Sequence, residues 1–386
     1  MPSTIQQLAP PADTAVIDRE NSLASTAFAR FSPPVARAVL QLFFLIAAVF
    51  VAISLSPQGM GFADGPRFAD APTDIDLYNA EIKLMRKGAG YYQAAASELP
   101  SKGYPTASVF NWRTPLPMWI FAALPEPGGR AVICFAAFLL IVCASGWIAR
   151  RNGVFAGMLT AALVFTAVMP CFLRGVCVMP VLWAAVFIGL SLCAYAANWR
   201  TAAVLLGLTA LAMRDLAALY CWVAAAMAIR DKNWRELALW CVGFATYAVF
   251  FWLHAHQVAL HRTAEAVSHD GGWLQLGGAA FVISLAQVNS LLLALPQPFA
   301  AIYLALALLG WASVRETALA RVAITASAYV ILFAVIGHPF NQYWGALLAP
   351  LAAIGVALSP KAIIELWQAA RGETNTRKAL LPNAVS

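Results

Sequence analysis

The sequence predicts an all-α protein that crosses a membrane about ten times. Hydrophobic residues make up 61% of the chain, charged residues only 11%, and the mean hydropathy is +0.72. This composition excludes an ordinary soluble globular protein. Apolar runs of bilayer-crossing length recur along the chain, and Lys and Arg gather in the segments between them. That pattern is typical of a polytopic membrane protein.

The two ends of the chain are expected to be tails on the cytoplasmic side. Residues 1–36 are rich in Pro, Ala and Ser, a composition that favours a loosely ordered segment. The apolar run from Ala38 to Ser56 is the first span, and it is retained because no small-residue cleavage site follows it. A transmembrane domain is therefore expected over residues 37–360, with a second tail over 361–386.

A long external loop, residues 57–128, follows the first span. Within it Ile75, Tyr78 and Ile82 recur at helical spacing, which predicts an amphipathic helix in residues 70–92. Residues 116–124 are apolar but too few to cross a bilayer, and prolines flank them. This piece is expected to be re-entrant or interfacial.

Two carboxylates, Asp74 and Asp76, fall in the first turn of that amphipathic helix. Thr73 stands three residues before Asp76, the arrangement of a capping box, and the helix dipole favours acids at this end. Asp76 is therefore either a cap or a functional group. Asp74 is either a functional carboxylate or a solvated loop residue.

The remaining spans follow from apolar runs, and their sides follow from charge. They are expected at about 129–149, 153–169, 176–197, 201–229, 237–257, 298–314, 321–337 and 344–359. Arg150, Arg151 and Arg200 fall on one side, which the positive-inside rule assigns to the cytoplasm. The second external segment is 258–297, in which 274–295 predicts another interfacial helix. The last outer turn, Gly337–Trp344, contributes Asn341 and Tyr343 either to a site or to helix caps.

The run 201–229 is interrupted at its centre by Arg214 and Asp215. A single helix here would put the basic residues of 230–235 outside, against the charge rule. Two short helices that meet at Arg214 restore the rule and place an ion pair below the outer surface. Such a pair either faces a polar cavity, or its two charges only neutralise each other between helices.

Composition and spacing also limit the partners. The net charge is +7, but no basic stripe with interleaved aromatic residues is present, so nucleic acid is not expected. No zinc-type cysteine spacing occurs, and His254 and His256 point to different helix faces, so no metal or other cofactor is expected. Cys171 and Cys177 either pair in an oxidising compartment or remain buried thiols.

Taken in order, several pieces of the chain resemble the GT-C superfamily of integral-membrane glycosyltransferases. They are a long external loop after the first span, an Asp-x-x-x-Tyr helix (Asp74–Tyr78), a Gly-x-x-Tyr-Tyr-like piece (Gly88–Tyr92), an Arg-x-Pro turn (Arg113–Pro115) and an Arg-Asp helix end (Arg214-Asp215). The chain is most similar to the polyprenol-phosphate-mannose-dependent mannosyltransferases. It is more distantly similar to protein O-mannosyltransferases and lipid A aminoarabinose transferases, but it lacks the Asp-Glu pair of their first loop.

The resemblance implies an inverting hexosyl- or pentosyltransferase of the cell envelope, in the plasma (inner) membrane with its active site on the outer, periplasmic face. The donor would be a polyprenyl-phosphate sugar, and the acceptor a hydroxyl of a glycan, a glycolipid or another molecule. Asp74 matches the base of the family, and Asp76 is the second catalytic candidate. The candidate substrate-binding residues are Tyr78, Arg113, Arg174, Arg214, Asp215, Arg262, Asn341 and Tyr343.

Two other classes of function compete with a transferase. A transporter or flippase of a lipid-linked sugar would place its polar residues near the midplane, whereas here they gather toward the outer side. No internal repeat is evident, which also disfavours a transporter built from inverted halves. A scaffold would not need an ion pair within the membrane.

Overall fold

The computed structural model describes residues 25–57, 73–263, 266–268 and 274–373. Within these ranges the chain is helical, and the only β pairing is one antiparallel bridge between Leu274 and Ile336. Parts of the expected tails and of the loop 57–128 lie outside the described residues, as do Glu265, His269 and Asp270 of the second external segment.

Ten described helices correspond to the ten expected spans. They are α2 (Pro33–Ser54), α7 (Glu126–Asn152), α8 (Val154–Val168), α9 (Pro180–Ala196), α10 (Arg200–Met213), α11 (Ala218–Arg230), α12 (Trp234–His261), α15 (Gln297–Ala312), α16 (Thr317–Val335) and α17 (Gly345–Arg371). Among the described residues, six helices are long and apolar enough to cross a membrane, and α9, α10 and α15 are shorter apolar helices. The all-α, polytopic prediction is confirmed.

The break between α10 and α11 lies where the charge rule predicts it. Arg214 has an extended backbone, with φ −154° and ψ 124°, and a short 3₁₀ turn, η5 (Asp215–Ala217), leads into α11. The break frees carbonyl groups at the end of α10, and the Thr114 hydroxyl donates to one of them, the Met213 oxygen, at 3.0 Å. A segment of the outer loop is thereby joined to this helix end.

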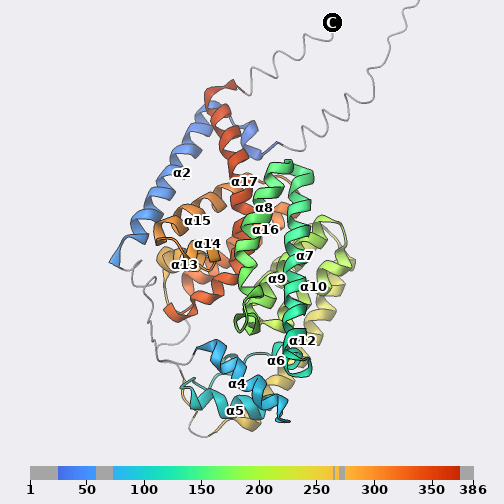
Figure 1. Cartoon of the computed structure of the whole chain (residues 1–386). Coiled ribbons are helices and arrows are strands. Elements are labelled where there is room, and N and C mark those ends of the chain that lie inside the picture. The colour runs from blue at the N-terminus through green and yellow to red at the C-terminus, as the bar shows by residue number, and fades with distance from the viewer. Residues whose placement is uncertain (1–24, 58–72, 264–265, 269–273, 374–386) are drawn as a thin grey trace, which may run out of the picture.

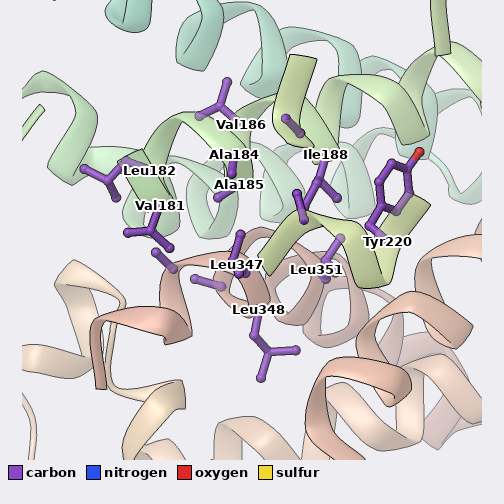
Figure 2. Packing of buried hydrophobic residues seen from close by; sticks show 14 of the residues in the cluster. Val181, Leu182, Ala184, Ala185, Val186, Ile188, Tyr220, Leu347, Leu348 and Leu351 are labelled. Carbon is purple, nitrogen blue, oxygen red and sulfur yellow. The ribbon is translucent and has the colours of Figure 1, made fainter. Parts of the chain in front are cut away.

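The core of the bundle is built around α9. Apolar residues surround this helix, so nearly all of its side chains are buried, as expected for a helix enclosed by others. Figure 2 shows Val181 and Ala185 of α9 on the side facing Leu347 of α17, with Tyr220 of α11 beside Ile188. Helices α7, α10 and α17 cover α9, so α9 fixes the relative positions of the elements that carry the outer segments.

The bundle has two chemically different ends. Helices α4 (Asp74–Arg86), α5 (Tyr91–Ser101) and α6 (Leu116–Ala123) lie together at one end, and the end of α17 lies at the other (Figure 1). Ion pairs join the loops that the charge rule assigns to the cytoplasm: Arg151–Glu316 at 3.3 Å, Arg200–Glu236 at 2.7 Å and Arg321–Asp231 at 3.1 Å. The basic interhelix loops therefore share one side, as the sequence predicts.

Both ends of the transmembrane unit extend beyond the expected limits. The 3₁₀ turn η1 (Ala27–Arg30) precedes α2, and α17 continues past residue 361 to Arg371. Phe28 and Leu40 pack with Leu366 and neighbouring residues of α17 in a small second core. The expected tail is helical here because an apolar face within it is covered by the first helix.

The outer segment 274–295 differs from the predicted interfacial helix. It forms two short helices, α13 (Gly278–Ala286) and α14 (Ser290–Leu293), and α13 is buried among α2, α15, α16 and α17. Its apolar residues occupy every face, so burial within the protein satisfies them better than a polar interface does.

Cys171 and Cys177 are free, buried thiols in this structure.

Candidate functional site

The helix α4 presents two faces with different chemistry. Asp74, Tyr78 and Glu81 lie on one face at helical spacing, and Asn79, Lys83 and Arg86 lie on the other. The first face packs toward α5 and the Arg113 turn. The second lines a separate cavity with α6, α7 and the turn near Arg174.

The capping interpretation of Asp76 agrees with the structure. One carboxylate oxygen, Oδ2, accepts from the Thr73 backbone N–H at 3.0 Å and from the Thr73 hydroxyl at 2.7 Å, while the Asp76 N–H donates to that hydroxyl at 3.2 Å. These hydrogen bonds hold the pKa of Asp76 below its usual value. Asp76 is exposed and its carboxylate serves the helix N-terminus.

Asp74 is placed differently, at the edge of the buried part of the outer segment. Its Oδ1 accepts a hydrogen bond from the Tyr104 hydroxyl at 2.7 Å. Its Oδ2 is buried and has no hydrogen-bond partner among the described residues. Leaving a buried carboxylate oxygen unpaired is costly. Asp74 therefore has a free acceptor position that the fold keeps available.

Arg113 is close enough to Asp74 for their charges to interact, and aromatic hydroxyls fix its side chain. Its Nε donates to the Tyr78 hydroxyl at 3.2 Å, and its Nη2 donates to the Tyr343 hydroxyl at 3.1 Å. The Tyr91 hydroxyl donates to the backbone oxygen of Arg113 at 2.8 Å. These contacts bring together the first outer loop and the turn η6 (Pro339–Trp344).

The electrostatics of Tyr78 connect the members of this cluster. Burial, and then the charge of Asp74, raise the pKa of Tyr78 far above its usual value, while Arg113 and Arg214 act in the opposite direction. Tyr78 therefore remains a neutral phenol. Asp74, Arg113 and Arg214 are therefore all close enough to Tyr78 to interact with it electrostatically.

Glu81 belongs to this region, although the sequence analysis does not select it. Its side chain is buried, and burial is the main cause that raises its pKa to about 8, with the charges of Glu98 and Asp74 adding to the effect. The signal was available, since Glu81 follows Tyr78 by three residues and shares its helix face.

The Arg214–Asp215 pair lies at the broken helix end, close to this cluster. Arg214 is only 4% exposed, and its Nε lies 3.3 Å from Asp215 Oδ1. The geometry is that of an ion pair without a well-aligned hydrogen bond, because the same Nε has no hydrogen-bond partner among the described residues. Arg214 thus retains a donor that could meet an anion.

Three candidates lie outside the cluster. Arg262 is exposed and its Nη1 donates to the Ala107 oxygen at 2.9 Å, so it supports a loop. Asn341 is buried, and its Oδ1 accepts from the His338 N–H at 2.9 Å, which makes it a cap of η6. Arg174 lines the cavity on the opposite face of α4.

An apolar groove of about 480 Å³ approaches the cluster along the side of the bundle. It lies between α6, α10 and α12, and its walls include Leu116, Trp119, Leu208 and Tyr247. Leu116 stands three residues after Arg113, so one end of the groove is near the basic turn. The sequence analysis does not identify this groove, because its walls come from segments far apart in the chain.

Among the described residues, no group of three or more His, Cys, Asp and Glu side chains is arranged to hold a metal ion.

No family model matches the chain, and no curated protein matches it. Among solved structures, the chain is similar to ArnT from Cupriavidus metallidurans, crystallised in the apo state, with a TM-score of 0.47 and 16% identity. The alignment covers 90% of this chain and 63% of ArnT, so the chain spans less than two thirds of that protein. A likeness at this level carries no inference about activity.

Proposed function

We propose that the protein is a GT-C-like, inverting glycosyltransferase that moves a sugar from a polyprenyl-phosphate donor to an acceptor hydroxyl. The observation that supports this most is the buried, unpartnered Oδ2 of Asp74, with the fixed guanidinium of Arg113 close enough to interact with its charge. A general base needs a free acceptor position, and a phosphate leaving group needs a nearby cation.

In the proposed reaction the acceptor oxygen attacks the anomeric carbon while the bond from that carbon to the phosphate oxygen breaks. Asp74 Oδ2 takes the proton of the attacking hydroxyl, and the Tyr104 hydroxyl holds Oδ1 in place. The phosphate leaves with the bonding electrons as a stable anion and needs no acid of its own. A single displacement of this kind inverts the anomeric configuration.

Arg113 and Arg214 are the proposed contacts of the donor phosphate. Arg113 is fixed by two tyrosine hydroxyls, so little rotamer freedom would be lost when a phosphate binds. Arg214 supplies a second buried cation, with Asp215 as its orienting partner. The fit of the donor to mannosyl groups rests only on the sequence resemblance, and a hexosyl or pentosyl group of another kind fits the same chemistry.

The apolar groove supports a lipid-linked donor. Its walls are almost entirely apolar, and it opens beside α6, near the Arg113 turn. A polyprenyl chain could lie there while its phosphate reaches the basic residues. We place this end of the bundle on the outer face of the plasma membrane, because the arginine-rich interhelix loops gather at the opposite end.

A flippase of lipid-linked sugars is the second candidate, and reconstitution separates the two. The full chain is incorporated into liposomes with a labelled polyprenyl-phosphate sugar, and the membrane extract of the producing cells serves as acceptor. We expect label to move onto acceptor material without any change in donor leaflet. Leaflet exchange with no transfer would replace the transferase by the flippase.

A further inference from the structure

The second face of α4 borders a cavity of about 580 Å³ that the proposed reaction does not use. Five basic side chains from three parts of the chain line it: Lys83, Arg86, Lys87, Arg130 and Arg174. No Asp or Glu is among its described lining residues. Apolar atoms of Ile82, Phe121 and Val178 complete the wall.

This concentration of positive charge stands at an unexpected place. The cavity is lined by residues of α4, α6 and the start of α7. Figure 1 shows α4 and α6 at one end of the bundle, with the C-terminal end of α17 at the other. Membrane proteins collect Lys and Arg on the cytoplasmic side and have few on the other. The helix dipole favours Lys83, Arg86 and Lys87 near the end of α4, but it does not explain why Arg130 of α7 faces the same space.

Several basic residues elsewhere in the bundle pair with carboxylates, whereas Lys83, Arg86 and Lys87 of the cavity form no such pair among the described residues. Arg151, Arg200 and Arg321 each pair with a carboxylate within 3.4 Å. In the part of the chain that the structure describes, Lys83, Lys87 and Arg86 form no ion pair with a carboxylate side chain. Arg86 instead donates to two backbone oxygens, those of Phe121 at 2.8 Å and Leu124 at 3.2 Å.

These backbone contacts give the cavity a fixed wall. They hold the guanidinium of Arg86 against α6, so α4 and α6 cannot separate without breaking two hydrogen bonds. The flexible Lys83 and Lys87 side chains remain able to reach an anion. A rigid guanidinium with mobile ammonium groups around it is a common way to bind phosphate.

We propose that this cavity binds a phosphate group carried on a molecule of about sugar size, at a site separate from Asp74. A cavity of about 580 Å³ falls in the range of small-molecule sites and is far larger than a bare phosphate needs. The phosphate belongs either to the headgroup of an anionic membrane lipid or to a soluble phosphate compound. Binding at this cavity is independent of sugar transfer at Asp74.

The test uses the full-length chain in detergent and two probes. Phosphatidic acid in a phosphatidylcholine background represents the membrane source, and its bound copies are counted by native mass spectrometry. Inorganic phosphate represents the soluble source, and its affinity is read from the shift in thermal unfolding temperature. Both measurements are made on wild type, on Lys83→Gln/Lys87→Gln, and on Lys232→Gln/Arg235→Gln, which loses the same charge at the opposite end.

We expect the Lys83→Gln/Lys87→Gln variant to bind at least one probe about tenfold more weakly, while the control variant changes by less than about twofold. Selective loss of phosphatidic acid identifies a lipid headgroup, and selective loss of inorganic phosphate identifies a soluble ligand. The proposal is overturned if neither probe binds, or if the two variants bind both probes equally well. The unfolding temperatures without probe report whether each variant is folded.

Discussion

Tyr104 orients the carboxylate on which the proposed chemistry depends, and no other described residue donates to it. Replacing Tyr104 by Phe removes that hydrogen bond and lets the Asp74 carboxylate rotate. We expect kcat to fall about tenfold, because a base that leaves its position loses most of its effect. Transfer rates of purified variants measure this.

The matched control for Tyr104→Phe is Tyr303→Phe. The Tyr303 hydroxyl is buried and has no hydrogen-bond partner among the described residues, so its removal should cost little. We expect near-normal transfer and stability for this control. Equal rates in the two variants would remove Tyr104 from the mechanism.

Glu81 makes stability depend on pH. Its pKa is raised to about 8 in the folded protein, mainly by burial, against a usual value of 4.5. Its contribution to stability is therefore complete below pH 4.5 and declines as pH rises through 8, because the unfolded chain releases the proton first. Glu81→Gln should remove this decline and raise stability at pH 9, by on the order of 5 kcal/mol.

The unfolding temperatures of wild type and Glu81→Gln, measured from pH 4 to pH 9 in one detergent, check this sign. The two curves should converge toward pH 4 and separate as the pH rises to about 8, with the variant more stable. If the wild type loses no stability relative to Glu81→Gln as the pH rises, the raised pKa of Glu81 is contradicted.

At the residue level, the sequence separates Asp74 from Asp76 only by a capping box at Asp76 and by the family resemblance at Asp74. Both lie in the first turn of one helix, and only Asp76 has a local signal, the Thr73 capping box. The residue that distinguishes Asp74 is Tyr104, thirty positions away in sequence. Contacts of this kind depend on how α5 folds back on α4, and no local pattern records them.

At the element level, helices α15 and α17 cross closely at two glycines. A Cβ atom on Gly310 would overlap the carbonyl oxygen of Gly355, so the two backbones approach as near as small residues allow. We expect Gly310→Ala to lower stability by about 1–3 kcal/mol or more, since the overlapping atom is backbone and cannot rotate away.

Gly146→Ala in α7 is the control for that substitution. A Cβ there meets only the end of the Arg150 side chain, at 3.5 Å, and Ala is the better helix former. Thermal unfolding in detergent should find Gly146→Ala at or above wild type and Gly310→Ala below it. Equal stabilities would mean that α15 and α17 do not cross so closely.

The distribution of Lys and Arg predicted the break between α10 and α11 correctly, whereas hydrophobicity misplaced the segment 274–295. The break at Arg214 follows from the charge rule, since one long helix would have put basic residues on the wrong side. The segment 274–295 was misplaced because a short helix that is apolar all round looks the same from sequence whether it lies in an interface or inside a bundle.

At the scale of the whole molecule, the predicted number and order of helices agree with the structure, while the cavities could not be predicted. Span length and loop charge are local properties that the bilayer imposes. The apolar groove and the basic cavity instead take their walls from α4, α6, α7, α10 and α12 together. Arg174, a candidate substrate-binding residue from the sequence, lines the cavity on the far face of α4.

In the whole molecule, α4 lies between two sites at one end of the bundle, one on each of its faces. The Asp74 face joins Arg113 and Tyr343, and the Lys83 face joins Arg130 and Arg174. Only the first face offers a buried carboxylate oxygen without a partner. We therefore propose that the reaction takes place on the first face and that the second face only binds an anion.

The most direct measurement of the central claim is sugar transfer by Asp74→Asn compared with Asp76→Asn. Each variant removes one negative charge from the first turn of α4, and only Asp74 has a buried acceptor oxygen without a partner among the described residues. We predict that Asp74→Asn loses transfer by at least about a thousandfold and still binds donor, while Asp76→Asn keeps transfer and loses only about 1 kcal/mol of stability. Wild-type transfer by a folded Asp74→Asn variant would contradict the account.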